Sequence, residues 1–481
     1  MMPPVSDRAP PPALRTPTLL DRLGEALDLG GVSCCQWKGH YKRSYWESGA
    51  GDVDLLVDPA LSERLDGVLD RLGFKLALPT PEGLIPGTTS WFGYDTHQRA
   101  LIHVHVHVRL TLGGYWTTMY RLPIERALLD ATAPRLPFAV PEPELEFLIF
   151  VLRSVQRYRL LDLFTQGQPR WLRAAQPEFA YLLAQVDRRR LLAKLEELLP
   201  TIDIAFFDAC ARSLRPGVSR WLRLWLRWKL HGRLRPHAHR PPDGLLLRRV
   251  GRKLRLLPRP PGLRLAHGGR LIALLGGDGA GKTTCTAELA RWLGAQLEVR
   301  TAHLGRPPRS WTTLFIGGLL KVRRALRRNG QQGTPGVLEL LRLVCTARDR
   351  YLLFMKMRRF AEAGGIALCE RYPVPQNRLL VGPEIARLLG HGRDTPIARW
   401  LMHLEQWYYR RITPPDVVIV LLVDPELAVR RKTDEPADYV RARSRIIWET
   451  DWQATSARVV DAGRPLAEVI AALKGIVWSE I

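Results

Sequence analysis

A short apolar run that leads directly into a glycine-rich loop is the feature that most restricts the fold of this chain. The run covers 271–275, the loop covers 276–281, and a helical stretch follows as far as 293. A buried strand that passes through a tight turn into a helix is the first half of a crossover unit in a parallel sheet. Because apolar runs and helical stretches keep alternating after this point, residues 264–481 are expected to form a doubly wound parallel sheet.

The glycine-rich loop has the spacing of a phosphate-binding loop, Gly-x-x-x-x-Gly-Lys-Thr over 276–283. Its glycines allow backbone N–H groups to surround phosphate oxygens, and the helix that follows adds the positive end of its dipole. We expect Lys282 to bridge the terminal phosphates of a nucleotide and Thr283 to offer its hydroxyl to Mg²⁺. ATP and Mg²⁺ are therefore the expected cofactors. The expected nucleotide contacts are Gly276, Gly277, Asp278, Gly279, Ala280, Gly281, Lys282, Thr283 and Thr284.

This loop and four later motifs together resemble the thymidylate kinases. The motifs are Gly-Gly-Asp-Gly-Ala-Gly-Lys-Thr-Thr at 276–284, the segment 344–350 ending in Asp-Arg, the segment 364–372 ending in Glu-Arg-Tyr, the segment 414–426 ending in Asp-Pro-Glu, and Val-Val-Asp-Ala at 459–462. The resemblance covers less than half of the chain. It implies a P-loop NTPase fold and transfer of the γ-phosphoryl group of ATP to a nucleoside monophosphate or another small phosphorylated acceptor. It also implies a homodimer.

The same resemblance implies roles for four charged residues. Glu370, at the end of a buried strand, would hold a Mg²⁺-bound water or accept the proton of the attacking group, and Arg371 would bind the acceptor phosphate. Arg430 or Arg431 would close over the transferred phosphoryl group as part of a lid. Two structural alternatives stay open: Glu370 and Arg371 form an ion pair, and Arg430 and Arg431 belong to a solvated helix face.

The acceptor side departs from the family pattern. The family's Arg-Glu-Pro-Gly-Gly motif is absent after the second strand, where only Arg306 is available to replace its arginine. Thr346 stands where the family stacks an aromatic side chain on thymine, and Glu370 replaces the catalytic Asp. Arg350 is the second expected acceptor contact. The identity of the acceptor is therefore left open.

Residues 19–140 resemble the nucleotidyltransferases, whose fold is of the α+β class. The resemblance rests on Gln-Trp-Lys-Gly at 36–39 and on Gly-Asp-Val-Asp at 51–54. Side chains alternate along a strand, so Asp52 and Asp54 are expected on one face, where the pair would hold Mg²⁺.

The third carboxylate of that family is expected on the segment 101–109. Its position reads His105 here, and His103 and His107 share the same face of a strand. Three interpretations therefore stay open: an active transferase, a histidine-bound metal site, and a degenerate domain that binds a nucleotide or a sugar without chemistry.

Composition separates three further segments. Residues 1–18 are predicted to be a disordered, proline-rich tail, 141–235 a helical region, and 236–263 a basic, proline-rich linker. The whole chain has 72 Lys and Arg against 47 Asp and Glu, a net charge of +25. Much of that excess lies between 211 and 270, which hold 17 Lys and Arg and a single acidic residue.

The segment 219–230 lies inside this basic stretch and combines arginines with tryptophans and leucines at helical spacing. This pattern is typical of a helix that lies on a membrane surface. The structural alternative is a helix that packs on its own domain with extended arginine side chains. Nucleic acid is the less favoured partner, because no recognised nucleic-acid module accompanies the charge.

The composition excludes several classes of protein. Six cysteines without a Cys-x-x-Cys pair predict neither a disulfide framework nor a zinc finger, and no apolar run is long enough to span a membrane. The start of the chain lacks the apolar segment of a secretory signal, so a cytoplasmic location is expected. The favoured function is that of an ATP-dependent phosphotransferase. The alternatives are an ATP-binding regulatory or docking protein with degenerate catalytic sites, and a nucleotidyltransferase acting through 19–140.

Overall fold

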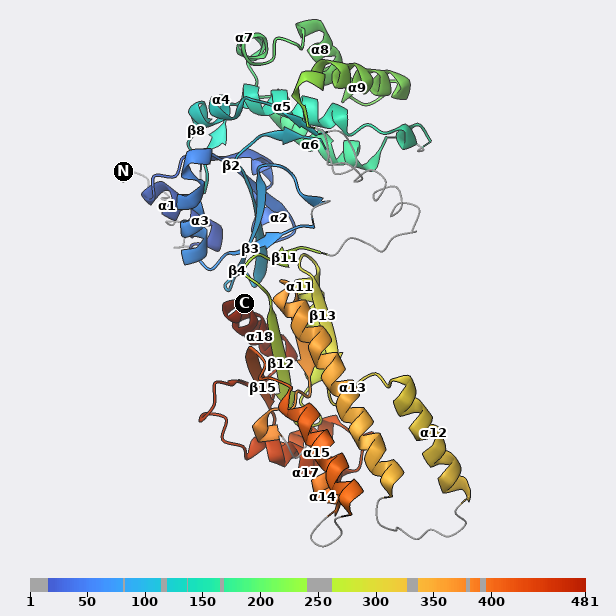
Figure 1. Cartoon of the computed structure of the whole chain (residues 1–481). Coiled ribbons are helices and arrows are strands. Elements are labelled where there is room, and N and C mark those ends of the chain that lie inside the picture. Colours follow the sequence, from blue (N-terminus) through green and yellow to red (C-terminus); the bar gives the residue numbers. More distant parts are fainter. Residues whose placement is uncertain are drawn as a thin grey trace, which may run out of the picture. The chain divides into compact units, whose positions relative to one another are not determined.

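The computed structural model divides into two compact units, Met1–Pro260 and Pro261–Ile481 (Figure 1). The residues that it describes are 16–80, 83–113, 119–135, 137–164, 168–239, 262–326, 336–377, 381–389 and 395–481. Most of the predicted tail 1–18 and most of the predicted linker 236–263 therefore lie outside the described residues.

The first unit is built on a mixed sheet. Its strands are β1 (Cys34–Lys38), β2 (Asp52–Val57), β3 (Lys75–Leu78), β4 (Thr88–Asp95) and β5 (Ala100–His107), in the order β1-β2-β5-β4-β3. Strands β2 and β5 run parallel to each other, and the other neighbouring pairs are antiparallel.

Two amphipathic helices, α1 (Leu19–Leu29) and α3 (Ser62–Arg71), cover one face of this sheet with leucine and valine side chains. The short helix α2 (Arg43–Glu47) contributes Trp46 to the same core. Side chains alternate along β2, so Val53, Leu55 and Val57 point into this core. Asp52 and Asp54 consequently lie on the opposite face of the sheet.

The remainder of the first unit is mostly helical. It contains α4 (Glu125–Asp130), α5 (Pro143–Gln156), α6 (Arg170–Leu183), α7 (Arg188–Leu198), α8 (Ile204–Ser213), α9 (Arg220–Leu234) and the short strands β6 (Thr111–Leu112), β7 (Met119–Arg121), β8 (Thr132–Ala133), β9 (Val140–Pro141) and β10 (Ala238–His239). Helix α5 is buried nearly all round, in keeping with its apolar run from Phe147 to Leu152. Its core includes Cys35 and Trp37 of β1, so the predicted segments 19–140 and 141–235 share one hydrophobic core.

The second unit contains a fully parallel sheet. Its strands are β12 (Arg270–Gly276), β13 (Val299–His303), β14 (Ile366–Glu370), β15 (Val417–Leu422) and β16 (Arg458–Asp461), in the order β13-β14-β12-β15-β16. Every neighbouring pair is parallel, and a short strand β11 (Arg264–Leu265) precedes them. The central strands are continuous apolar runs because both of their faces are covered.

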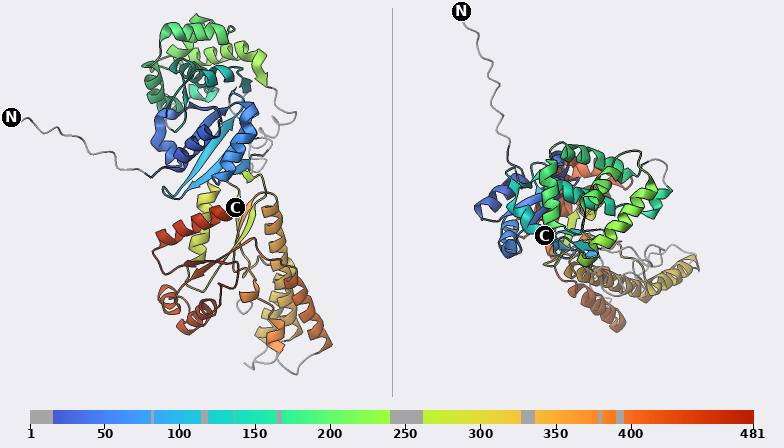
Figure 2. Two further views of the ribbon diagram at one scale, coloured as in Figure 1. Left: turned by 90° about the vertical axis from the view of Figure 1, so that its left-hand side faces the viewer. Right: turned by 90° about the horizontal axis from the view of Figure 1, so that it is seen from above.

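Helices lie on both faces of the parallel sheet (Figure 2). They are α11 (Lys282–Gly294), α12 (Trp311–Leu326), α13 (Val337–Glu362), α14 (Ile385–Leu389), α15 (Pro396–Arg410), α16 (Pro425–Arg431), α17 (Ala437–Trp448) and α18 (Leu466–Glu480). Helix α13 packs on one face through Phe354, Met357 and Phe360. Helix α18 lies on the other face beside α11, where Trp292 and Trp478 meet edge to face.

These two units confirm the predicted multidomain α/β class, with parallel strand pairing and many helices. None of the described helices is both long enough and apolar enough to cross a bilayer.

Candidate functional site

The predicted site residues of the second unit gather at one edge of its parallel sheet. The glycine-rich loop leaves the carboxyl end of β12 and enters α11, whose first residue is Lys282. Strand β14 lies beside β12 and ends at Glu370. Parallel strands end at a common edge, where ligands of open α/β sheets bind. Residues far apart in the sequence therefore meet around the loop.

The glycines of the loop are required by close backbone contacts. A Cβ atom on Gly277 would lie 2.7 Å from Cα of Ser444 in α17. A Cβ atom on Gly279 would lie 2.6 Å from the carbonyl oxygen of Ala428 in α16, and Gly279 also has a φ of +81°. Larger residues at these two positions would push the loop away from both helices.

Lys282 is buried inside the loop. Its side chain is only 7% exposed, and Nζ donates a hydrogen bond to the carbonyl oxygen of Gly277 at 2.5 Å. Burial and the nearby positive charge of Arg371 lower the pKa of Lys282 to about 8, against the opposing effect of Asp278 and Glu370. The ammonium group is thus held against the loop backbone, where little water is available to stabilise its positive charge.

Thr283 and Glu370 are brought together by the same edge. The Thr283 hydroxyl donates to Oε2 of Glu370 at 3.0 Å, and the Glu370 side chain is largely buried. The neighbouring strand supports this position, because the N–H of Leu304 donates to the carbonyl oxygen of Glu370. A hydroxyl and a carboxylate in contact are oxygen donors of the kind that Mg²⁺ prefers.

Asp278 is the centre of a second cluster. Its carboxylate forms ion pairs with Arg371 and with Nε of Arg443, the latter at 2.7 Å. Burial would raise the pKa of Asp278, but Arg371, Lys282 and Arg443 hold it below its usual value. Arg371 has a positive φ of +51°, an uncommon conformation for a residue with a side chain. Two arginines thus face the loop from β14 and α17.

Arg443 is a site residue that the sequence analysis did not identify. It lies in the run Arg-x-Arg-x-Arg over 441–445 of α17. Arg441 instead pairs with Glu426 and Asp438. This run indicates that an arginine of the segment could reach a phosphate site. Which of the three arginines reaches the loop is determined by the rotation of α17 about its axis.

The other predicted arginines are placed differently. Arg431 donates to the carbonyl oxygens of Ala462 and Gly463 at 2.8 and 3.3 Å. Arg350 is buried; its Nε donates to the carbonyl oxygen of Leu304 at 2.6 Å, and its Nη1 donates to the Tyr409 hydroxyl. Burial lowers the pKa of Arg350 to about 10. Arg306 and Arg430 are solvent-exposed.

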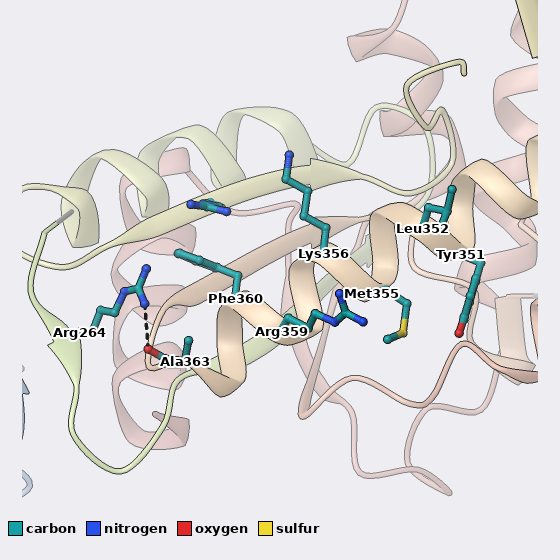
Figure 3. Close-up of a pocket in the computed structure, with 9 residues that line it drawn as sticks. Arg264, Tyr351, Leu352, Met355, Lys356, Arg359, Phe360 and Ala363 are labelled. Carbon is teal, nitrogen blue, oxygen red and sulfur yellow. Dashed lines mark hydrogen bonds between the residues drawn. The ribbon is translucent and has the colours of Figure 1, made fainter. Parts of the chain in front are cut away.

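A cavity of about 510 Å³ lies elsewhere in the second unit (Figure 3). Its lining includes Arg264, Arg300, Lys356, Arg359 and Phe360. Arg300 lies close to the start of β13 and Arg264 precedes β12, so this cavity opens near the amino ends of the strands. It is therefore separate from the edge that carries the glycine-rich loop.

In the first unit, the two predicted metal-binding aspartates meet histidines. Asp52 pairs with His103 and Asp54 with His105 in the parallel register of β2 and β5. Lys38 Nζ lies 2.9 Å from Oδ1 of Asp54. Burial opposes ionisation of Asp54, but Lys38, His105 and His107 hold its pKa well below the usual value.

No protein-family model matches the chain. Part of it is similar to two proteins of Escherichia coli K12, uncharacterized ATP-binding protein YghR and uncharacterized ATP-binding protein YghS. The chain is 24% identical to YghR over 219 residues, which cover 42% of this chain and 83% of YghR. It is 25% identical to YghS over 216 residues, which cover 42% of this chain and 90% of YghS.

Proposed function

We propose that the second unit is a P-loop kinase that binds ATP and transfers its γ-phosphoryl group to a small phosphorylated acceptor. The observation that carries this proposal is the buried Lys282 beside the contact between Thr283 and Glu370, all at the carboxyl edge of a parallel sheet. The names of YghR and YghS support ATP binding. Phosphoryl transfer rests on the residues of this chain alone.

The loop and its lysine would bind the nucleotide. Backbone N–H groups of 276–283 surround the phosphates, and Lys282 exchanges its bond to Gly277 for a bond to a terminal phosphate oxygen. Thr283 and Glu370 would hold Mg²⁺ directly or through water, and the ion neutralises charge on the phosphates when bound. Glu370 is also placed to accept the proton of the attacking group.

The acceptor would enter beside Asp278. In this structure Asp278 balances Arg371 and Arg443, so an incoming phosphate would compete with that carboxylate for both arginines. Arg306 is solvent-exposed and would contact the acceptor. Arg430 is also exposed and would close over the transferred phosphoryl group as part of the lid. We assign Arg350 and Arg431 a positioning role, because both donate to backbone carbonyls.

A panel of acceptors tests this function. Full-length protein, Mg²⁺ and ATP labelled on the γ-phosphate are incubated with nucleoside monophosphates and sugar phosphates, and labelled product is separated from ATP. We expect label on one acceptor class with the wild type and none with Lys282→Ala. Nucleotide binding without any labelled acceptor, under conditions in which the lysine variant no longer binds, would leave an ATP-binding protein and overturn the kinase.

The proposed role of Lys282 predicts that ATP affinity depends on pH. The protonated lysine binds phosphate, and its pKa in the free protein is about 8. Bound phosphates raise that pKa, so affinity is full below about pH 8 and falls as pH rises above it, by up to about tenfold per pH unit. Titration calorimetry without Mg²⁺ from about pH 7 to about pH 9 checks this. In Lys282→Arg, whose side chain stays charged, the decline should disappear; an equal decline in that variant would assign it to another group.

A second candidate function is docking on an anionic membrane surface through α9. Three arginines of this helix point inward, where they bind carbonyl oxygens that end other elements. Arg223 is buried and donates to Ser213 and Arg215, Arg220 to Leu163, and Arg227 to Tyr158. Carbonyl groups at helix ends have no partner within their own helix, which explains this use of arginine.

The outward face of α9 carries tryptophans. Trp221, Trp225 and Trp228 are 71%, 49% and 65% exposed, and Nζ of Lys229 lies over the last two rings at 5.6 and 5.3 Å. No acidic residue occurs from 209 to 242. Exposed indoles beside an exposed lysine suit the headgroup layer of an anionic bilayer.

Vesicle sedimentation tests this docking. Phosphatidylcholine vesicles with added phosphatidylglycerol should bind the protein, and salt should weaken the binding. Replacing Trp221, Trp225 and Trp228 together by serine should reduce binding at least about tenfold, because three exposed indoles lose their apolar contact. The control replaces Trp311 and Trp400, which are 88% and 62% exposed in the second unit. Equal loss in the control, no binding to these vesicles, or binding to DNA alone would overturn the proposal.

A further inference from the structure

Three histidines and two aspartates form a cluster on one face of the sheet in the first unit. His103, His105 and His107 alternate along β5, and Asp52 and Asp54 alternate along the parallel neighbour β2. Two groups of three potential ligands result, Asp52 with His103 and His105, and Asp54 with His105 and His107. Within each group the ligand atoms lie within 4.8 Å of one another.

The Asp54 group is already neutralised by the protein. Nζ of Lys38 lies 2.9 Å from Oδ1 of Asp54, and Nε2 of His107 contacts the same oxygen at 3.0 Å. The other ring nitrogen of His107 is hydrogen-bonded to the Thr88 hydroxyl at 3.1 Å. Since a cation and two hydrogen bonds occupy this group, a metal ion would have to displace Lys38.

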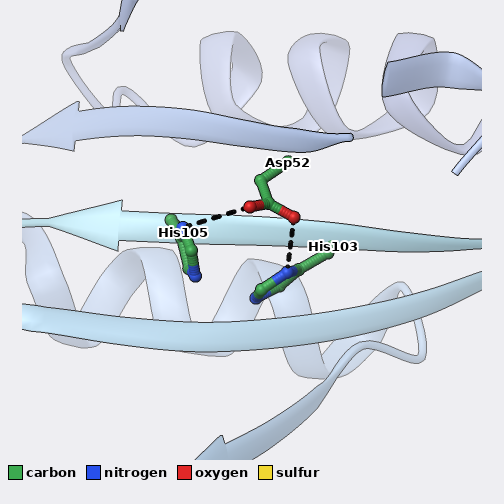
Figure 4. A group of neighbouring side chains, drawn as sticks. All are labelled: Asp52, His103 and His105. Atoms are coloured by element: carbon green, nitrogen blue, oxygen red, sulfur yellow. Dashed lines mark hydrogen bonds and ion pairs between the residues drawn. The ribbon is translucent and has the colours of Figure 1, made fainter. Parts of the chain in front are cut away.

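The Asp52 group is open by comparison. Its two carboxylate oxygens face different imidazoles, with Nδ1 of His103 at 2.8 Å from Oδ1 and Nδ1 of His105 at 3.9 Å from Oδ2 (Figure 4). The side chains of Asp52 and His105 are 43% and 23% exposed. Ligands of a tetrahedral ion with bonds of about 2.0–2.1 Å lie about 3.3 Å apart, so small side-chain shifts would suffice.

His103 is held in place for such a role. Its ring stacks on Phe92, with ring centroids 4.2 Å apart and an angle of 15° between the planes. Nε2 of His103 is buried and has no hydrogen-bond partner among the described residues. The bond from Nδ1 to Asp52 is therefore the polar contact that an ion would replace, and the stacking on Phe92 would keep the orientation of the ring.

We propose that Asp52, His103 and His105 bind a first-row transition-metal ion such as Zn²⁺. Two imidazole nitrogens and a carboxylate suit Zn²⁺ and its neighbours, whereas Mg²⁺ prefers oxygen ligands alone. The exposed side of Asp52 and His105 leaves a coordination position for water or for an oxygen of an exchangeable ligand. This site is independent of the kinase proposed for the second unit, and Asp54 stays with Lys38.

Metal titration of the full chain tests the site. After removal of metals, Co²⁺ is added as a spectroscopic probe and Zn²⁺ and Mg²⁺ are titrated by calorimetry. We expect one Zn²⁺ per chain, visible absorption bands of Co²⁺ bound in a low-symmetry site, and no heat from Mg²⁺ at this site.

Four variants assign the ligands. Asp52→Asn and His105→Asn should weaken Zn²⁺ binding by at least about a hundredfold, whereas Asp54→Asn and the exposed control His97→Asn should leave it within a few fold. Circular dichroism checks that each variant is folded. The proposal is wrong if Zn²⁺ fails to bind, if Mg²⁺ binds here equally well, or if Asp54→Asn has the effect expected of Asp52→Asn.

Discussion

Replacing Lys282 with methionine is expected to reduce phosphoryl transfer from ATP by at least about 10³-fold. The ammonium group is the buried cation of the loop, held 2.5 Å from the carbonyl oxygen of Gly277. Its charge is only weakly screened there, so in the proposed reaction it would act strongly on the negative charge that moves between phosphates. Methionine has a similar length and removes the charge alone.

The fold should survive this substitution. The variant loses one hydrogen bond, worth about 1 kcal/mol, and no longer has to bury an ammonium group. Lys321→Met, at an exposed position of α12, is the matched control. For both variants we measure the initial rate at which label passes from ATP to the acceptor, and the thermal midpoint of unfolding. Residual transfer above about one tenth of the wild-type rate in a folded Lys282→Met protein would remove this residue from the proposed mechanism.

The sequence predicted the central part of the second unit well because strong local signals agree there. The apolar run 271–275 and the glycines after it correspond to β12 and its loop, and the helical stretch corresponds to α11, Lys282–Gly294. The contact between Thr283 and Glu370 follows from parallel pairing, because the loop that leads from β12 to Thr283 begins at the same edge of the sheet at which β14 ends. These features depend on the periodicity of apolar residues and on the positions at which strands end, and both can be recognised in a sequence.

The partners of individual arginines could not be predicted in the same way. The sequence left open an ion pair between Glu370 and Arg371. In the described part of the chain Arg371 instead pairs with Asp278, and Glu370 accepts a hydrogen bond from Thr283. Arg443 reaches the loop because α17 lies against Gly277 through Ser444. Such contacts depend on how each helix is rotated about its axis and packed. The sequence alone does not distinguish the arginine that reaches the loop from its neighbours in the same helix.

The two faces of α9 illustrate the same limit. Arginines at 220, 223 and 227 and tryptophans at 221, 225 and 228 both repeat with helical spacing. Periodicity therefore defines two faces without telling which one points inward. The carbonyl oxygens of Ser213, Arg215 and Tyr158 decide the matter, because buried carbonyl groups need donors and the guanidinium groups supply them.

Glu370→Gln is expected to reduce phosphoryl transfer by about 10²–10³-fold and to raise the Mg²⁺ concentration needed for half of the maximal rate. The glutamine keeps the shape of the side chain and can still accept the hydrogen bond from Thr283, which is 3.0 Å away in the wild type. It cannot accept a proton from the acceptor, and it offers the ion a neutral oxygen. ATP binding measured without Mg²⁺ should change little.

The Mg²⁺ dependence separates this role from a purely structural one. Glu370 also lies close enough to Lys282 to raise the pKa of that lysine, so a structural carboxylate would mainly support the charge of the loop. In that case Glu370→Gln would lower the thermal midpoint and weaken ATP binding without Mg²⁺, while the Mg²⁺ requirement stayed constant. Glu362→Gln, at an exposed position near the end of α13, controls for the loss of one negative charge in the same unit. An unchanged Mg²⁺ requirement would show that Glu370 does not act on the metal, because a carboxylate that holds the ion must change its affinity when it loses its charge.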